Sequence, residues 1–262
     1  MLLPRNTLTA RSVLLSVLLG TDPPRLPVQV LVRTTELFGI AEGTTRTALS
    51  RMTAAGEVVA DDGSYALAAD RLLARQARQT ASRAARTAPR WDGAWAQAVV
   101  GAQGRRRPAA DRAALRSALT AARLAELREG VWLRPDNLGG PPEVADSDAD
   151  VQWFRTFPVE DAVELARRLW DLDAWAAQAD DLRRQMAGLV APLEGGDHGS
   201  LRDGFVLSAA VLRHFQLDPL LPAELLSADW PGDALRKDYD RYDAAYRRIL
   251  GKWLSPRRRP TA

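Results

Sequence analysis

The sequence predicts the α+β fold class, in a chain built from more than one domain. Three observations lead to this prediction. Apolar residues recur at helical spacing in several segments, short alternating segments of strand type stand between them, and loops rich in proline, glycine or acidic residues separate the blocks. With 262 residues, of which 46% are hydrophobic and 26% charged, the composition is globular and the length suffices for one large domain or two to three small ones.

The first block covers residues 8–68 and begins with a short apolar segment, SVLLSVLL, at residues 12–19. We expect a first core helix here, with Thr9 as its N-cap. The segment is too short for a signal peptide and lacks a cleavage site. No apolar run in the chain approaches the length that crosses a bilayer, and we expect a cytoplasmic protein.

Two further helices are expected in the same block, joined by a tight turn. In residues 28–37, apolar side chains fall at helical spacings along one stripe. Gly39 then stands where a helix needs a left-handed C-terminal cap. The next helix is expected over 43–55, with Leu49 and Met52 facing inward.

A hairpin is expected directly after these helices. Two short alternating segments, EVVA at 57–60 and SYAL at 64–67, flank the turn sequence Asp61-Asp62-Gly63. A helix-turn-helix followed by such a hairpin is a winged helix-turn-helix, which is a DNA-binding unit. The alternative is an ordinary helical hairpin whose outer face happens to carry arginine, threonine and serine.

The outer face of helix 43–55 carries arginine and short hydroxyl side chains. Arginine pairs with guanine edges, and hydroxyls reach bases or phosphates without bulk. We expect this helix in a major groove and the hairpin near the adjacent minor groove, although the hairpin's two aspartates disfavour tight phosphate contact. The residues expected to contact double-stranded DNA are Thr44, Thr45, Arg46, Thr47, Ser50, Arg51 and Ser64.

Charge is unevenly distributed along the chain. Residues 1–107 contain 15 arginines and 8 acidic residues, a net charge of +7, whereas residues 108–262 carry −4 and the whole chain +3. The basic front half fits a polyanionic partner. The chain has no cysteine, which excludes a disulfide framework, a thiolate zinc site and a cysteine nucleophile.

The middle of the chain predicts a connecting helix at 69–89, stopped by Pro89, and an α+β domain over 90–158. The connecting helix is polar, and it is either solvated or close to DNA phosphates. The expected elements of the domain are strands at 95–100, 131–133 and 151–157, a helix over 112–127 and an exposed loop over 138–150.

The last block, residues 159–255, predicts a helical domain, followed by a basic tail at 256–262. Apolar and aromatic residues recur at core spacings in three segments, which span 161–193, 205–217 and 238–254.

Catalytic and metal-binding motifs are scarce. The chain has two histidines, His198 in a glycine-rich loop and His214 on a helix, and no phosphate-binding motif of the Walker or Rossmann type. Asp146, Asp148 and Asp150 alternate, but the glycine and distal glutamate of a calcium loop are missing. We therefore expect no enzyme activity, no cofactor and no metal.

Five parts of the chain resemble the PaaX family of bacterial transcriptional repressors. They are ARSVL at 10–14, RTALSRM at 46–52, WDGAW at 91–95, GVWLRP at 130–135, and His214 with DPLLPAELL at 218–226 and DWPG at 229–232. They follow the family's order and extend over nearly the whole chain. The chain departs from the family in the strand and loop after WDGAW, where Gln97-Ala98 and Gly101-Ala102-Gln103 replace a more apolar strand and a proline-containing loop.

The resemblance implies an N-terminal winged helix-turn-helix, a central ferredoxin-like domain similar to the Cas2 proteins, and a helical C-terminal domain. It also implies a homodimer on palindromic operator DNA. In the best-known member, the genes repressed are those of phenylacetate degradation, and an acyl-coenzyme A, phenylacetyl-coenzyme A, releases the repressor. The residues expected to contact such an effector are Arg134, Arg213, His214 and Trp230.

Two other functions stay open at this point. The similarity to Cas2 raises a metal-dependent nuclease, but Asp92 precedes its strand, and Gly101 and Ala102 stand where a carboxylate is needed. The other alternative is a DNA-binding protein without an effector.

Overall fold

The computed structural model describes residues 8–84, 90–101, 108–138 and 151–254. These residues form helices and two small antiparallel sheets, so the predicted α+β class is confirmed. Most of the expected loop 138–150, the end of the connecting helix and the basic tail 256–262 lie outside the described residues.

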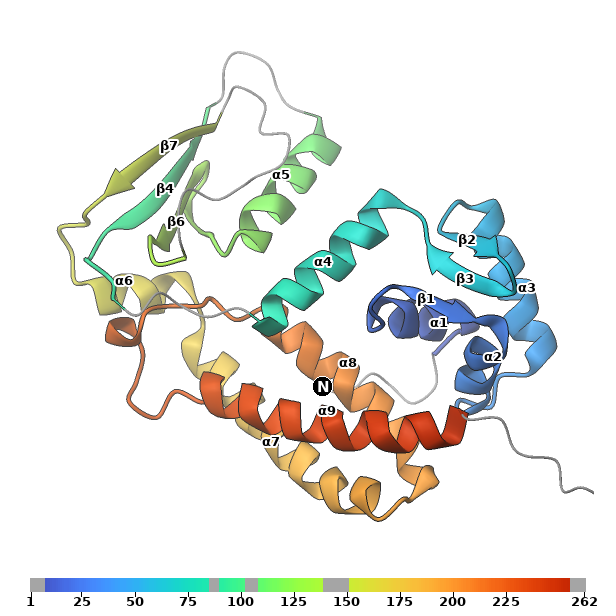
Figure 1. Ribbon diagram of the computed structural model, residues 1–262. Helices are drawn as coiled ribbons and strands as arrows, with labels where there is room; N and C mark the ends of the chain where they lie inside the picture. The colour runs from blue at the N-terminus through green and yellow to red at the C-terminus, as the bar shows by residue number, and fades with distance from the viewer. Residues whose placement is uncertain (1–7, 85–89, 102–107, 139–150, 255–262) are drawn as a thin grey trace, which may run out of the picture. The chain divides into compact units, whose positions relative to one another are not determined.

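The chain divides into two compact units, whose elements can be followed in Figure 1. The first unit groups Met1–Arg83, Ala179–Phe215 and Asp233–Ala262, and the second groups Ala84–Gln178 and Gln216–Gly232. The domain boundaries expected from the sequence stay a prediction. Among the described residues, no helix combines the length and the apolar character that a membrane span requires.

The N-terminal segment of the first unit contains four helices and a three-stranded sheet. The elements are α1 (Ala10–Leu19), β1 (Arg25–Pro27), α2 (Val28–Glu36), α3 (Glu42–Ala54), β2 (Val58–Asp61), β3 (Ser64–Leu67) and α4 (Asp70–Ala84). The sheet is antiparallel, in the order β1-β3-β2. The hydrophobic core of this N-terminal segment joins α1, α2 and α3 through the buried side chains of Leu14, Leu18, Leu31, Leu49 and Met52.

Three local features expected from the sequence are confirmed. Thr9 caps α1, because its hydroxyl accepts a hydrogen bond from the backbone N–H of Ser12 at 3.2 Å. Gly39 follows α2 with a φ of 70°. Asp62 and Gly63 have φ of 44° and 70°, so both central residues of the hairpin turn are left-handed, as a two-residue type I′ turn requires.

The rest of the first unit is mainly helical within the residues that the structure describes. It consists of most of α7 (Leu172–Glu194), the short helix η1 (His198–Ser200), nearly all of α8 (Leu201–Gln216) and α9 (Gly232–Leu254). α9 contacts α8 through the hydrogen bond from the Tyr242 hydroxyl to the carbonyl of Gly204, at 2.6 Å. It contacts α7 through the ion pair of Arg183 with Asp238, at 2.7 Å.

The C-terminal helices of this unit also contact its N-terminal segment. Phe38, in the turn between α2 and α3, meets Phe205 of α8 edge to face, with ring centroids 5.2 Å apart. The guanidinium of Arg33 in α2 lies over the Trp253 ring of α9. The segment that contains α2 and α3 and the C-terminal helices therefore belong to one packed unit.

The second unit is built on a four-stranded antiparallel sheet in the order β5-β6-β4-β7. Its elements are β4 (Trp95–Val100), α5 (Ala109–Ala121), β5 (Ala125–Arg128), β6 (Val131–Pro135), β7 (Val151–Thr156), α6 (Ala162–Leu169), η2 (Ala223–Leu225) and the first turns of α7. On one face, Ala98 and Trp132 pack with Leu119 of α5. On the other face, Trp95 packs with Leu165 of α6.

Two of the expected helices end earlier than the sequence predicted. The helix expected over 112–127 ends at Ala121, and Arg123, with a φ of 69°, turns the chain into β5. The run expected over 161–193 divides into α6 and α7 because Trp170 is extended. Asp171 then accepts a hydrogen bond from the N–H of Ala174 at 3.0 Å, as the first residue before a new helix does.

Candidate nucleic-acid interface

The orientation of α3 is set by three buried side chains that lie on one face of the helix. Thr45, Leu49 and Met52 follow one another at intervals of four and three residues, and all three are buried. Glu42 in the first turn is favourable near the positive end of the helix dipole. The helix is therefore fixed by its inner face, and its outer face is left to solvent.

Thr45 belongs to this inner face and not to the DNA-contacting set in which the sequence placed it. Its side chain is fully buried, and its hydroxyl shares a hydrogen bond of 2.7 Å with that of Thr35 in α2. The Thr35 hydroxyl also donates to the carbonyl of Val32. Thr45 therefore joins α3 to α2 and does not reach a molecule on the outer face.

The other five candidates on α3 are exposed: Thr44, Arg46, Thr47, Ser50 and Arg51. The two arginines differ in their surroundings. Arg46 forms an ion pair with Glu42, one turn earlier, at 2.7 Å, whereas Arg51 has no ion-pair partner among the described residues. The Thr47 hydroxyl donates to the carbonyl of Gly43 at 2.8 Å, which is a local bond within the helix.

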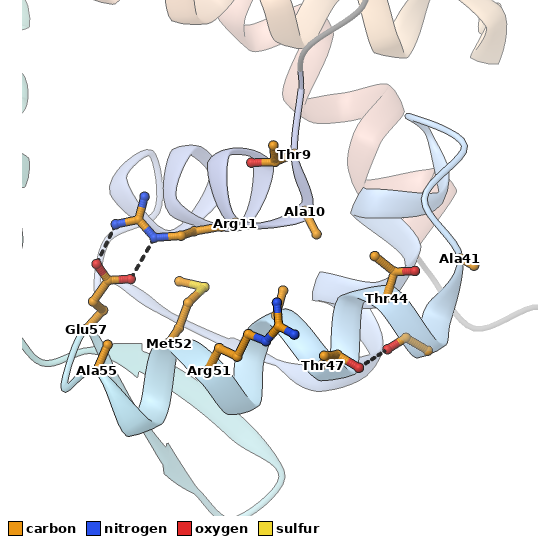
Figure 2. Close-up of a pocket in the computed structure, with 12 residues that line it drawn as sticks. Thr9, Ala10, Arg11, Ala41, Thr44, Thr47, Arg51, Met52, Ala55 and Glu57 are labelled. Carbon is orange, nitrogen blue, oxygen red and sulfur yellow. Dashed lines mark hydrogen bonds and ion pairs between the residues drawn. The ribbon is translucent and has the colours of Figure 1, made fainter.

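A groove of about 830 Å³ runs between the amino end of α1 and the outer face of α3 (Figure 2). Thr44, Thr47 and Arg51 line it from α3, at helical spacings of three and four residues. The remaining wall residues are Thr9, Ala10, Arg11, Ala41, Gly43, Ala48, Met52, Ala55 and Glu57. Small side chains form much of the wall, so a wide ligand can approach α3 closely.

Arg11 and Glu57 close one end of the groove with an ion pair (Figure 2). Glu57 is only 4% exposed and follows Gly56, whose φ of 66° ends α3. The Arg11 guanidinium binds both carboxylate oxygens, and this contact raises the pKa of Arg11. The ion pair therefore links the start of α1 to the residues that follow α3.

Arg11 and Glu57 were not predicted from the sequence to belong to this surface. They are 46 residues apart, and helical or strand periodicity links only residues that are close in sequence. The available signal was an acidic residue directly after a helix-ending glycine and before an apolar strand. That signal marks Glu57 as unusual but does not identify its partner.

The hairpin after α3 brings an acidic tip. Ser64, its candidate for DNA contact, is half-buried and pairs with Asp61 across the turn. Arg25 of β1 neutralises Asp61 through an ion pair at 2.7 Å. The carbonyl of Gly63 accepts a hydrogen bond from the N–H of Val28, which attaches the turn to the start of α2.

The four residues expected to contact an effector belong to different units. Arg134 and Trp230 lie in the second unit, and Arg213 and His214 lie in the first. Burial lowers the pKa of the Arg134 guanidinium, while Asp136 acts in the opposite direction. Trp230 stacks on Trp175, with ring centroids 4.6 Å apart. His214 is buried and Arg213 exposed, and an effector role for these residues stays a prediction.

The described residues contain no group of three or more His, Asp or Glu side chains placed to hold a metal ion. Asp92, weighed above as a nuclease residue, accepts a hydrogen bond from the N–H of Ala94 and forms an ion pair with Arg155. Both contacts lower the pKa of Asp92. They give Asp92 a structural role at the start of β4.

Comparison with known proteins gives two family matches. Residues 9–71 match the family described as PaaX-like protein, and residues 170–255 match the PaaX-like protein C-terminal domain. No protein of curated function matches the sequence.

A solved structure, that of the uncharacterized protein Rv0674 from Mycobacterium tuberculosis, is similar over almost the whole chain. It is 41% identical, the alignment covers 94% of this chain and 99% of the other, and the TM-score is 0.71. The two family matches together extend over both ends of the chain, in the family's order. The chain belongs to the PaaX-like protein family.

Proposed function

We propose that the chain is a DNA-binding transcriptional repressor in which residues 28–67 act as a winged helix-turn-helix. The observation that carries the proposal is the outer face of α3, where exposed threonine, serine and arginine side chains stand beside a groove of about 830 Å³. Hydroxyl and guanidinium groups on one helix face are the chemistry that reads base edges and phosphates. Membership of the PaaX-like family supports the same role.

In this proposal α3 enters the major groove with Thr44, Arg46, Thr47, Ser50 and Arg51 as the contacting residues. Arg51 has no ion-pair partner among the described residues and is ready to bind. Arg46 has to exchange Glu42 for DNA, which costs little because an exposed pair of this spacing is worth only about 0.3–0.5 kcal/mol. Thr45 supports the helix from its inner face.

The hairpin has a minor part in the proposed complex. Ser64 is its one candidate contact, while Asp62 at the tip repels phosphate and the charge of Asp61 is already neutralised by Arg25. We infer that affinity comes mainly from α3 and that the hairpin sets the position of the helix on the duplex.

The strand order of the second unit supports the proposal that this unit is a ferredoxin-like domain. Its strands occur in the spatial order second-third-first-fourth, with every neighbouring pair antiparallel and α5 between the first two strands. This is the strand order of the split βαβ arrangement. We propose that this domain brings two copies of the chain together and performs no catalysis.

Release by an acyl-coenzyme A, with phenylacetyl-coenzyme A as the first compound to test, completes the proposal. The dimer has two arrangements, and the effector binds one of them more tightly. Only the arrangement that binds the effector less tightly fits both operator half-sites. Family membership is the support for this step.

Fluorescence anisotropy with DNA from upstream of the chain's own gene tests the DNA-binding role. We expect Arg51→Ala to weaken binding about tenfold, because one DNA contact is lost. The slope of the logarithm of the binding constant against the logarithm of the salt concentration should become smaller by about one. Arg167→Ala, which removes an exposed arginine of α6, is the matched control and leaves binding unchanged. Equal binding by Arg51→Ala and the unchanged chain would contradict the assignment of α3.

The same assay with phenylacetyl-coenzyme A tests the effector. Loss of the complex on addition of the thioester supports release, and free coenzyme A is the control. If neither compound changes the anisotropy, phenylacetyl-coenzyme A is not the effector, while DNA binding stands on the result for Arg51.

A further inference from the structure

Arg11 lines the groove beside α3 from the wall that α1 forms (Figure 2). It lies in the first turn of α1, which contains no acidic residue, and its side chain is 55% exposed. The DNA contacts proposed for α3 and the hairpin leave this wall of the groove without a role. An exposed guanidinium beside a DNA-reading helix is a natural partner for a phosphate.

Glu57 occupies only one edge of the Arg11 guanidinium (Figure 2). The two hydrogen bonds run from Nε and Nη2 of Arg11 to the two carboxylate oxygens. A guanidinium has five N–H donors, so this pair uses two of them. Among the described residues Arg11 has no other partner, and the edge formed by Nη1 and the outer side of Nη2 keeps its donors for a ligand.

The carboxylate that holds Arg11 is itself fixed by the backbone. The N–H of Glu57 donates to the carbonyl of Met52 at 2.9 Å, and the carbonyl of Glu57 accepts a hydrogen bond from the N–H of Ala68 at 3.0 Å. These bonds tie Glu57 both to the end of α3 and to the residue after β3. An arginine that is already held along one edge loses less conformational freedom when its other edge binds an anion.

With α3 in a major groove, the wall formed by α1 meets the DNA backbone. The major groove is about 12 Å wide, and a helix with its side chains is about 10–12 Å across, so the inserted helix fills the groove. An element beside that helix therefore faces sugars and phosphates instead of base edges. The small side chains of Ala10, Ala41, Ala48 and Ala55 leave room for a deoxyribose between α1 and α3.

We propose that Arg11 binds one backbone phosphate of the DNA through the free edge of its guanidinium, and that Glu57 positions it. The proposal deepens the proposed function and rests on it, because it takes α3 to be the helix in the major groove. Arg11 then adds affinity without sequence preference, since phosphate contacts carry no base information.

The negative charge of Glu57 does not cancel this contact. The Glu57 side chain is 6% exposed, whereas that of Arg11 is 55% exposed, so a phosphate that approaches from solvent meets the guanidinium first. Hydrogen bonds between a guanidinium and a phosphate are charge-assisted and short. The carboxylate acts on the far edge of Arg11 and sets its orientation.

Neutral methylphosphonate linkages, placed one at a time in the upstream DNA, test the contact by fluorescence anisotropy. Each removes the charge of one phosphate. At the linkage that Arg11 binds, we expect the unchanged chain to lose about tenfold in affinity and Arg11→Ala to lose nothing further, because its contact is already absent. With unmodified DNA, Arg11→Ala should weaken binding to the upstream duplex and to an unrelated duplex by the same factor.

Arg247→Ala is the matched control. Arg247 is also an exposed arginine of the first unit that pairs with a buried carboxylate, with side chains of Arg247 and Asp243 that are 58% and 9% exposed. It lies on α9 and does not line the groove. This variant should keep the affinity of the unchanged chain and the same loss at every linkage.

Two further variants separate binding from folding. Arg11→Ala leaves the Glu57 carboxylate buried without its arginine, so urea unfolding accompanies each binding measurement. Arg11→Met combined with Glu57→Gln removes both charges, and it should lose the same linkage as Arg11→Ala. Glu57→Gln alone keeps Arg11 but removes the ion pair, and it should reduce the loss at that linkage while leaving the losses at all others unchanged.

The outcomes distinguish this proposal from the proposed function. The same linkage profile for the unchanged chain, Arg11→Ala and the double variant would overturn the Arg11 contact, and a full loss at that linkage in Glu57→Gln would overturn the positioning role of Glu57. Neither result changes the expected effect of Arg51→Ala, on which the DNA-binding role of α3 is tested. If Arg51→Ala binds like the unchanged chain while Arg11→Ala loses its linkage, the assignment of α3 fails and the Arg11 contact stands.

Discussion

At the scale of single residues, Thr44 and Thr45 are neighbours with opposite surroundings. Thr44 lines the groove beside α3, whereas Thr45 is buried and its hydroxyl bonds to Thr35. The same side-chain chemistry therefore serves two different purposes one position apart. A ligand can reach Thr44, and the packing of α3 on α2 depends on Thr45.

Substitution by valine should separate these roles. Thr45→Val loses the hydrogen bond to Thr35 inside the core, and we expect a cost of about 1 kcal/mol in the free energy of unfolding. Thr44→Val should leave stability unchanged and weaken operator binding. Urea unfolding and fluorescence anisotropy measure the two effects, and a stability loss for Thr44→Val equal to that for Thr45→Val would contradict the assignment.

The position of Thr45 was available from the sequence. It precedes Leu49 and Met52 by four and seven residues, the spacing of one helix face, and both leucine and methionine were expected to face inward. Thr45 was nevertheless predicted to contact DNA because hydroxyl groups bind DNA, although its position in the helix places it on the inner face. Arg11 and Glu57 are the opposite case, because their ion pair joins sequence-distant segments that local patterns do not relate.

At the scale of elements, the close crossing of α8 and α9 depends on Gly204. A Cβ atom at this position would lie 2.8 Å from Cδ2 of the Tyr246 ring and 3.2 Å from the Tyr242 hydroxyl. The carbonyl of Gly204 also accepts the Tyr242 hydrogen bond. A glycine is therefore required here by the approach of α9 and not by its own backbone angles.

Gly204→Ala should destabilise the protein, although alanine is the better helix former by about 1 kcal/mol. The clash with the Tyr246 ring exceeds that gain, so we expect a net loss of about 1–3 kcal/mol. Gly188→Ala in α7 is the matched control, because nothing lies within 4 Å of its Cβ, and it should stabilise. Chemical unfolding of both variants checks the opposite signs.

The tyrosines of α9 predict a loss of stability in alkali. Burial raises the pKa of Tyr239, Tyr242 and Tyr246 above the ordinary value of 10. The unfolded chain releases these protons from about pH 10, whereas the folded chain keeps them, so stability is complete below pH 10 and falls above it.

Thermal melting between pH 8 and 11.5 measures this effect. Tyr246→Phe should flatten the alkaline decline and should not lower stability at pH 8, because the buried Tyr246 hydroxyl has no hydrogen-bond partner among the described residues. A melting temperature independent of pH up to 11.5 would contradict the argument.

Elements were predictable where a local rule decides them. The cap at Thr9, the glycine after α2 and the hairpin turn were all expected, because each depends on two to four adjacent residues. β5 was assigned to a helix, since leucines at helical spacing continue through residue 124 while Arg123 changes the chain direction. β1 was not expected, because three residues that include a proline carry no strand pattern.

At the scale of the whole molecule, the two units carry different chromophores. All four tyrosines lie in the first unit, together with one tryptophan, Trp253. The other seven of the eight tryptophans lie in the second unit. Tyrosine absorbance therefore reports mainly on the first unit and tryptophan fluorescence on the second.

We expect the two units to unfold in separate transitions. In urea, Gly204→Ala should lower the midpoint of the tyrosine signal and leave that of the tryptophan signal unchanged, because Gly204 and its contacts belong to the first unit. Equal shifts of both signals would show a single cooperative transition instead.

The division of the chain between the units has a practical consequence for building hybrid regulators. The chain passes from one unit to the other within α7, at the C-terminal ends of α4 and α8 and at the N-terminal end of α9, so the first unit is made of three separate pieces of sequence. A hybrid joined at a single point after α4 would transplant α1–α4 without the helices that contact Phe38 and Arg33. Grafting this module onto a foreign sensor therefore requires α8 and α9 to be carried along with it.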